Sequence, residues 1–95
     1  MRNYSYIFDK ENKMDKGEET KITIQGRLKI LNKSLVSEEN SVQYYQTLLE
    51  NTPTDSEEKI GERRMYEELQ NEERNHVRVI QGMIQHWKNQ LKDIK

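Results

Sequence analysis

Apolar residues recur every three or four positions along two long segments of the chain. The first series is Ile24, Leu28, Leu31, Leu35, Val42, Tyr45 and Leu49. The second series is Tyr66, Leu69, Ile80, Met83, Trp87 and then Leu91 or Ile94. This spacing places side chains on one face of an α-helix. The pattern therefore predicts two amphipathic helices, over about 22–51 and 56–93.

The two predicted helices are separated by a short polar segment with a strong helix breaker. Pro53 cannot continue the first helix, and it biases Thr52 away from helical backbone angles. A capping box for the second helix would pair Thr54 with Glu57 or Asp55 with Glu58. Because the connection is short, we expect an all-α antiparallel hairpin.

Composition limits how such a hairpin can be stabilised. The chain has 95 residues, of which 32% are hydrophobic and 35% charged, and it has no cysteine. Chains of this size with a small core usually need disulfides, a metal or a partner subunit, and disulfides are excluded here. The polar residues 1–19 are expected to form a flexible N-terminal arm, which leaves 20–95 as the helical hairpin.

Charge and hydropathy exclude two classes of partner. The net charge is −1 and the two signs are interspersed, so the chain offers no basic surface for nucleic acid. No apolar run is long enough to span a membrane, and the N-terminal residues lack the apolar core of a secretory signal. The expected location is the cytoplasm.

Three ionisable residues interrupt the two apolar series. Continuing the helical step from Leu35 reaches Glu38, and continuing it from Leu69 reaches Glu73 and then His76. Burying an unpaired carboxylate is costly, so such side chains need a partner. Since both interruptions fall near the middle of their helices, we expect the three side chains to meet.

The sequence Glu73-Arg74-Asn75-His76 is an E-x-x-H motif. Residues three apart on a helix share a face, so Glu73 and His76 can bind one cation. Di-iron carboxylate bundles use one glutamate from each of two helices and an E-x-x-H from each of the other two. This chain supplies half of that set. The alternative is that the three side chains form a buried polar network that fixes the register of a dimer.

The residues Glu38 to Tyr45, together with Glu73-x-x-His76, resemble the two metal-binding helices of ferritin-like proteins. Bacterioferritins and rubrerythrins carry this pair twice in one chain. A single copy resembles the encapsulated ferritins, which are rubrerythrin-like, half-size and two-helical. The resemblance covers about residues 31–94. At the C-terminus the chain departs from it, because Gln90–Lys95 does not resemble the targeting peptide of encapsulated ferritins.

The resemblance implies a ferritin-like four-helix bundle made by a homodimer, and a higher oligomer built from such dimers. It implies a ferroxidase centre of two irons per dimer, one per chain, with manganese or zinc as substitutes. Glu38, Glu73 and His76 would be the ligands and catalytic residues. It further implies iron storage as cargo of an encapsulin nanocompartment. The alternatives are a rubrerythrin-like peroxidase with an external electron donor and a non-enzymatic helical dimerisation module.

Four further residues have expected roles around this centre. Tyr45 and Tyr66 lie two turns from a proposed ligand, so their hydroxyls are expected to bond the carboxylates. Glu39 and Glu62 are candidates for an accessory or entry role, although the simpler interpretation is a surface residue for Glu39 and a helix-end residue for Glu62. His86 is expected to be a surface histidine, and Met83 and Trp87 are expected to pack.

Overall fold

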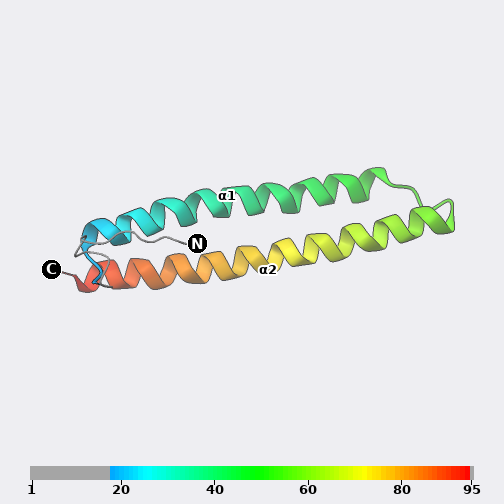
Figure 1. The fold of residues 1–95 in the computed structure, drawn as a ribbon. Helices are drawn as coiled ribbons and strands as arrows, with labels where there is room; N and C mark the ends of the chain where they lie inside the picture. The colour runs from blue at the N-terminus through cyan, green and yellow to red at the C-terminus, as the bar shows by residue number, and fades with distance from the viewer. Residues whose placement is uncertain (1–17, 95) are drawn as a thin grey trace, which may run out of the picture.

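The computed structural model of the chain describes residues 18–94, and these form two long helices that pack against each other. Helix α1 spans Lys21–Asn51 and helix α2 spans Glu57–Asp93. They run antiparallel, joined by a short turn at one end (Figure 1). The described residues contain no strand. The predicted all-helical hairpin is confirmed, while the expected N-terminal arm lies almost wholly outside the described residues.

The start of α1 is fixed by a capping box. The side chain of Thr20 accepts a hydrogen bond from the Thr23 amide, and the Thr23 side chain accepts one from the Thr20 amide. Thr23 also donates to Glu19, which pairs with Arg27 at 2.5 Å. These contacts satisfy amides that a helix N-terminus otherwise leaves unpaired. Glu19, expected in the arm, is thus tied to the first turns of α1.

The turn is closed from the side of α2. Ser56 is the N-cap of α2, and its hydroxyl accepts from the Lys59 amide. The capping boxes expected at Thr54 and Asp55 were therefore wrong by one or two residues. The guanidinium of Arg63 donates to the carbonyls of Leu49 and Thr52. It thereby covers carbonyls that the end of α1 leaves without a helical partner.

The contact between the helices buries little apolar surface. Only Ile24, Leu49 and Ile84 are buried apolar residues within the described part of the chain. Gln70 is also buried, with 5% of its surface exposed. Most of the predicted apolar residues are half-buried, and Met83 remains 47% exposed. The prediction that Met83 packs is wrong for the single hairpin, because the apolar arc of α2 is wider than the surface that α1 covers.

Several large apolar side chains of the hairpin remain exposed. We call the side that carries five of them the open face; these five are Ile30, Tyr44, Met65, Val79 and Met83. Helical spacing puts Ile30 and Tyr44 on one side of α1, and puts Met65, Val79 and Met83 on one side of α2. Ile30 and Met83 line one groove, with Leu31, Arg27 and Trp87, so the two sides face the same way.

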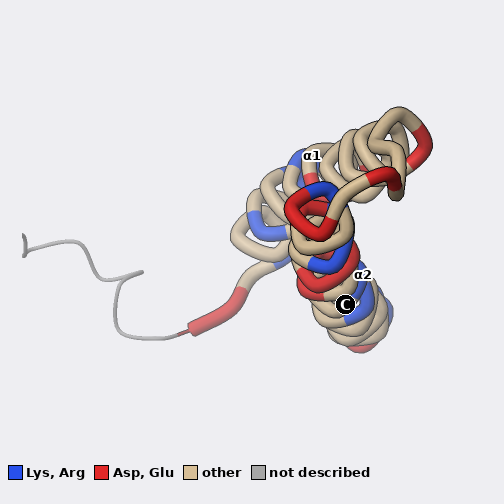
Figure 2. Tube along the Cα trace, turned by 90° about the vertical axis from the view of Figure 1, so that its right-hand side faces the viewer, with Lys and Arg blue, Asp and Glu red and all other residues tan. Residues whose placement is uncertain are grey.

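Charged residues are distributed along both helices. Figure 2 shows both acidic and basic positions on the two helices. Arg27 lies over the ring of Trp87 at 4.2 Å from the centroid, which joins the first turns of α1 to the last turns of α2. In the part of the chain that the structure describes, neither helix has the length and apolar character needed to cross a membrane.

Candidate metal centre

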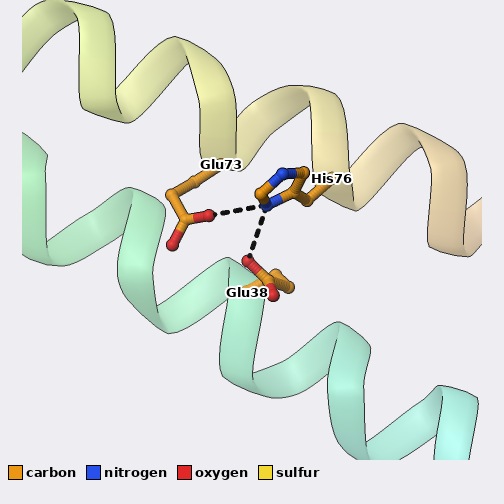
Figure 3. A group of neighbouring side chains, drawn as sticks. All are labelled: Glu38, Glu73 and His76. Carbon is orange, nitrogen blue, oxygen red and sulfur yellow. Dashed lines mark hydrogen bonds and ion pairs between the residues drawn. The ribbon is translucent and has the colours of Figure 1, made fainter.

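Glu38 on α1 meets Glu73 and His76 on α2 near the middle of the hairpin (Figure 3). The fold brings them together because Glu38 and Glu73 occupy core-facing positions, and His76 is one turn beyond Glu73. One ligand atom from each side chain can be chosen so that all three lie within 4.8 Å of one another. This is the meeting of side chains that the two interrupted apolar series predict.

His76 is the hub of the cluster. Its Nδ1 lies 2.9 Å from the Glu73 Oε1 and 3.5 Å from the Glu38 Oε1. The side chains of Glu38 and Glu73 are 28% and 22% exposed, whereas that of His76 is 54% exposed. The carboxylates thus lie between the helices, while the imidazole reaches the surface.

The Glu38 carboxylate is incompletely satisfied. Its Oε1 is buried and has no hydrogen-bond partner among the described residues. The His76 Nδ1 lies 3.5 Å from this oxygen, at ion-pair range but without hydrogen-bond geometry. A buried polar atom without a partner costs free energy, on the order of 1–3 kcal/mol. Since almost all such atoms in folded proteins are paired with protein, water or an ion, this oxygen is a position at which a water or a cation would bind.

The pKa values of the cluster follow from these contacts. Burial acts to raise the pKa of Glu73, but its contacts with Glu38, His76 and the Ser41 hydroxyl outweigh burial and hold the pKa below its usual value. The hydrogen bond with Glu73 raises the pKa of His76, with a further contribution from Glu38. Without a metal, these contacts therefore favour an ionised Glu73 beside a protonated His76.

This charge arrangement shows what the cluster can do chemically. The His76 Nδ1 lies between the Glu38 and Glu73 carboxyl groups, at a place where a cation would contact both. A divalent metal would replace the proton of His76 and gain oxygen and nitrogen ligands suited to iron, manganese or zinc. Three ligand atoms do not complete the coordination of such an ion, so further ligands must come from water or another chain.

The expected supporting residues are placed differently. Among the described residues, no hydrogen bond joins the hydroxyl of Tyr45 or Tyr66 to the cluster. Tyr45 instead packs edge-on against Tyr44, with ring centroids 5.4 Å apart. Both predicted tyrosine residues are half-buried. In the single hairpin, therefore, no hydrogen bond supports the predicted role of these two tyrosines in holding the carboxylates.

The two candidate entry residues also lie apart from the three ligands. Glu39 is exposed and lines a groove with Arg74 and Arg78, and it is not in the cluster. Glu62 pairs with Lys59 at 3.6 Å, one turn earlier on the same helix. His86 is exposed and packs edge-on against Trp87.

Two residues near the cluster were not predicted from the sequence. Ser41 lies one turn after Glu38; its hydroxyl donates to the Ser37 carbonyl at 3.2 Å and helps to lower the pKa of Glu73. Gln70 lies one turn before Glu73 and bonds across to α1. Serine and glutamine are common on helix surfaces, so only their spacing from Glu38 and Glu73 gave a signal.

Comparisons of the chain with protein-family models, with curated proteins and with solved structures found no match. The class of the molecule is therefore defined by its own geometry, as a two-helix hairpin with a Glu-Glu-His cluster between the helices.

Proposed function

We propose that this chain is an iron-handling protein that binds Fe(II) at Glu38, Glu73 and His76 and oxidises it with dioxygen. The observation that carries the proposal is the buried Oε1 of Glu38, which lacks a hydrogen-bond donor within a group of three potential ligands. A bound cation satisfies that oxygen and replaces the proton of His76. Carboxylates with one imidazole fit iron, and manganese or zinc can substitute.

The proposal requires a second copy of the chain. The cluster borders the open face, where His76 is 54% exposed and the neighbouring Val79 is 55% exposed. Two hairpins related by a two-fold axis would cover this face and bring two clusters together. The resulting four-helix bundle would hold four glutamates and two histidines, the set used by di-iron carboxylate proteins. Larger assemblies of dimers and an encapsulin shell remain expectations from the resemblance.

The residues then have defined roles in the oxidation. Glu38 and Glu73 of each chain bind Fe(II) as substrate, and their four charges offset the charge that the two ions gain. Two Fe(II) ions give one electron each to one O2, which takes up two protons and leaves as hydrogen peroxide. Two Fe(III) ions remain to be released or mineralised. His76 must lose its proton to bind iron, so iron binding is weaker in acid.

The test is an anaerobic titration of metal-free protein with Fe(II), followed by exposure to air while absorbance is recorded. We expect saturation at one iron per chain and rapid oxidation. His76→Ala and Glu38→Ala should abolish saturable binding. The matched controls are His86→Ala and Glu39→Ala, which remove the same side-chain types from exposed positions outside the cluster. Binding that is absent in the parent protein, or indifferent to His76→Ala and Glu38→Ala, would contradict the proposal.

Two other functions are separated by simple comparisons. A rubrerythrin-like peroxidase would turn over hydrogen peroxide faster than dioxygen when given an electron donor. A dimerisation module without a metal is favoured by one observation, the 2.9 Å contact between His76 and Glu73, which partly satisfies the cluster without an ion. That module predicts that chelators change neither the dimer nor its thermal stability.

A further inference from the structure

The most buried polar side chain in the described part of the hairpin lies next to the proposed metal centre. Gln70 is 5% exposed. Its Nε2 donates to the Val42 carbonyl at 3.1 Å and to the Gln46 Oε1 at 3.0 Å. Both acceptors belong to α1, so one amide group joins the two helices at adjacent turns. Such an amide is expensive to bury and keeps its bonds only in one alignment of the helices.

The acceptor on α1 is itself held in place. The Gln46 Nε2 donates to the Glu50 carboxylate at 3.1 Å, which leaves its Oε1 free to face Gln70. The orientation of both amides is therefore set by the bonds, since a reversed Gln46 would present a donor to a donor. The hydrogen bonds therefore run in one direction, from Gln70 as donor to Gln46 and from Gln46 as donor to Glu50.

This contact is one turn from the cluster on each helix. Gln70 precedes Glu73 by three residues, and Val42 follows Glu38 by four. We propose that Gln70 is a positioning residue, which fixes the register of α1 against α2 at which Glu38 meets Glu73 and His76. The functional part of this inference rests on the proposed metal binding.

The helices need such a contact because the few apolar side chains buried between them do little to fix one register of α1 against α2. Only three apolar side chains are buried between residues 18 and 94, and Ile24 and Leu49 lie near opposite ends of α1. A slip of one residue moves a side chain by about 1.5 Å along the helix and turns it by about 100°. Metal sites tolerate errors of only about 0.5 Å in ligand position. Gln70 provides a directional contact where the apolar ones are few.

The first experiment measures binding of Co(II), whose visible spectrum reports coordination geometry, to the full chain and to Gln70→Met. Methionine keeps the length of glutamine and its helix propensity but cannot donate. We expect affinity to fall roughly 10- to 100-fold, the loss typical of an outer partner of a metal site, with a changed spectrum. The control is Gln81→Met on α2, an exposed residue that should leave both unchanged.

The second experiment measures register without a metal. Because the chain has no cysteine, a doubly substituted chain with Lys33→Cys and Arg64→Cys takes up spin labels at these two positions and nowhere else. Both positions are exposed, and they lie at different heights along the hairpin, one on each helix. Dilution with unlabelled chains keeps the measurement within one hairpin. Gln70→Met should broaden the distance distribution, and Gln81→Met should not.

The two measurements separate the possible failures. If the parent chain binds no Co(II), the proposed function fails, and the distance distribution alone decides whether Gln70 fixes the register. If the parent binds Co(II) and Gln70→Met binds it within about twofold with the same spectrum, the positioning role is overturned. An unchanged distance distribution in Gln70→Met overturns it as well.

Discussion

Two polar contacts join α1 to α2 one turn apart, and they differ in how completely they are satisfied. Around Gln70, the amide donates two hydrogen bonds and its Gln46 acceptor is oriented by Glu50. Around Glu38, a buried oxygen has no donor and the imidazole is half-exposed. A fully satisfied buried network makes a structure rigid, whereas an unsatisfied buried group needs a further partner such as water or an ion. Alignment is accordingly the proposed role of the first contact, and metal binding that of the second.

The largest expected effect is the gain in thermal stability when metal is added, which should depend on the Glu38 contact. At a free Fe(II) concentration of about 100 times Kd, under anaerobic conditions, binding should stabilise the parent chain by about 2.7 kcal/mol. For a chain of this size, that corresponds to a rise in Tm of roughly 10 to 20 °C. His76→Ala should show no rise, because the site is lost. Thermal unfolding followed by circular dichroism checks this, and an equal rise in both proteins would place the metal elsewhere.

A smaller effect, of opposite sign at the two contacts, is expected without metal. Glu38→Leu removes the oxygen that lacks a donor, so at a pH where His76 is neutral and does not need the Glu38 charge, the free energy of unfolding should rise by about 1 kcal/mol. Gln70→Met removes satisfied hydrogen bonds, so it should fall by about 1 kcal/mol or less. Urea unfolding of the metal-free proteins measures both. If Glu38→Leu instead destabilises the chain, Glu38 belongs to a structural network and the dimerisation module becomes the better account.

The pH dependence of the metal-free protein is expected to be smaller still. The pKa of His76 is raised from 6.5, so its contribution is complete below about 6.5 and is lost as pH rises through the folded value. The pKa of Glu73 is lowered from 4.5, so its contribution is present above about 4.5 and is lost in acid. Stability should peak between these limits. His76→Gln should flatten the alkaline side of a plot of Tm against pH, and an unchanged plot would show that the ion pair contributes nothing.

Metal affinity should respond to pH in the opposite direction on the alkaline side. Because a metal must displace the His76 proton, affinity rises where metal-free stability falls.

The smallest effect is expected at the acidic residues outside the cluster. Glu39→Gln and Glu62→Gln should change the initial rate of iron oxidation by less than about twofold, since isolated surface charges steer ions weakly. Stopped-flow absorbance measures the rate. A loss of roughly tenfold would restore the entry role for the residue concerned.

Periodicity predicted the helices well because it depends on the local chain. Helix α1, with Thr20 and Thr52 as its caps, begins one residue before the predicted start at position 22. Helix α2 begins one residue after the predicted start at position 56. The same periodicity predicted the meeting of Glu38 with Glu73 and His76, since polar residues at core-facing positions must find each other. The N-cap at Ser56 was missed because several neighbouring residues have capping side chains.

Contacts that depend on the exact rotation of one helix against the other could not be predicted. The two buried residues of α2, Gln70 and Ile84, are absent from the expected series, although members of that series such as Tyr66 and Ile80 are half-buried. The apolar residues of α2 form one wide arc, part of which contacts α1 and part of which belongs to the open face. The average direction of the arc therefore lies between these two faces and coincides with neither. For the same reason, Met83 was assigned to packing, although α1 does not cover it.

The contacts of Arg63 with Leu49 and Thr52 bear on the order in which the chain folds. They join residues 14 and 11 positions apart, whereas the Arg27–Trp87 contact joins residues that are far apart in sequence. Closing a short loop costs less entropy than closing a long one. We expect folding to start at the turn and to proceed towards the termini. The cluster would then assemble before the terminal turns close, so an ion could be captured by a chain whose ends are still forming.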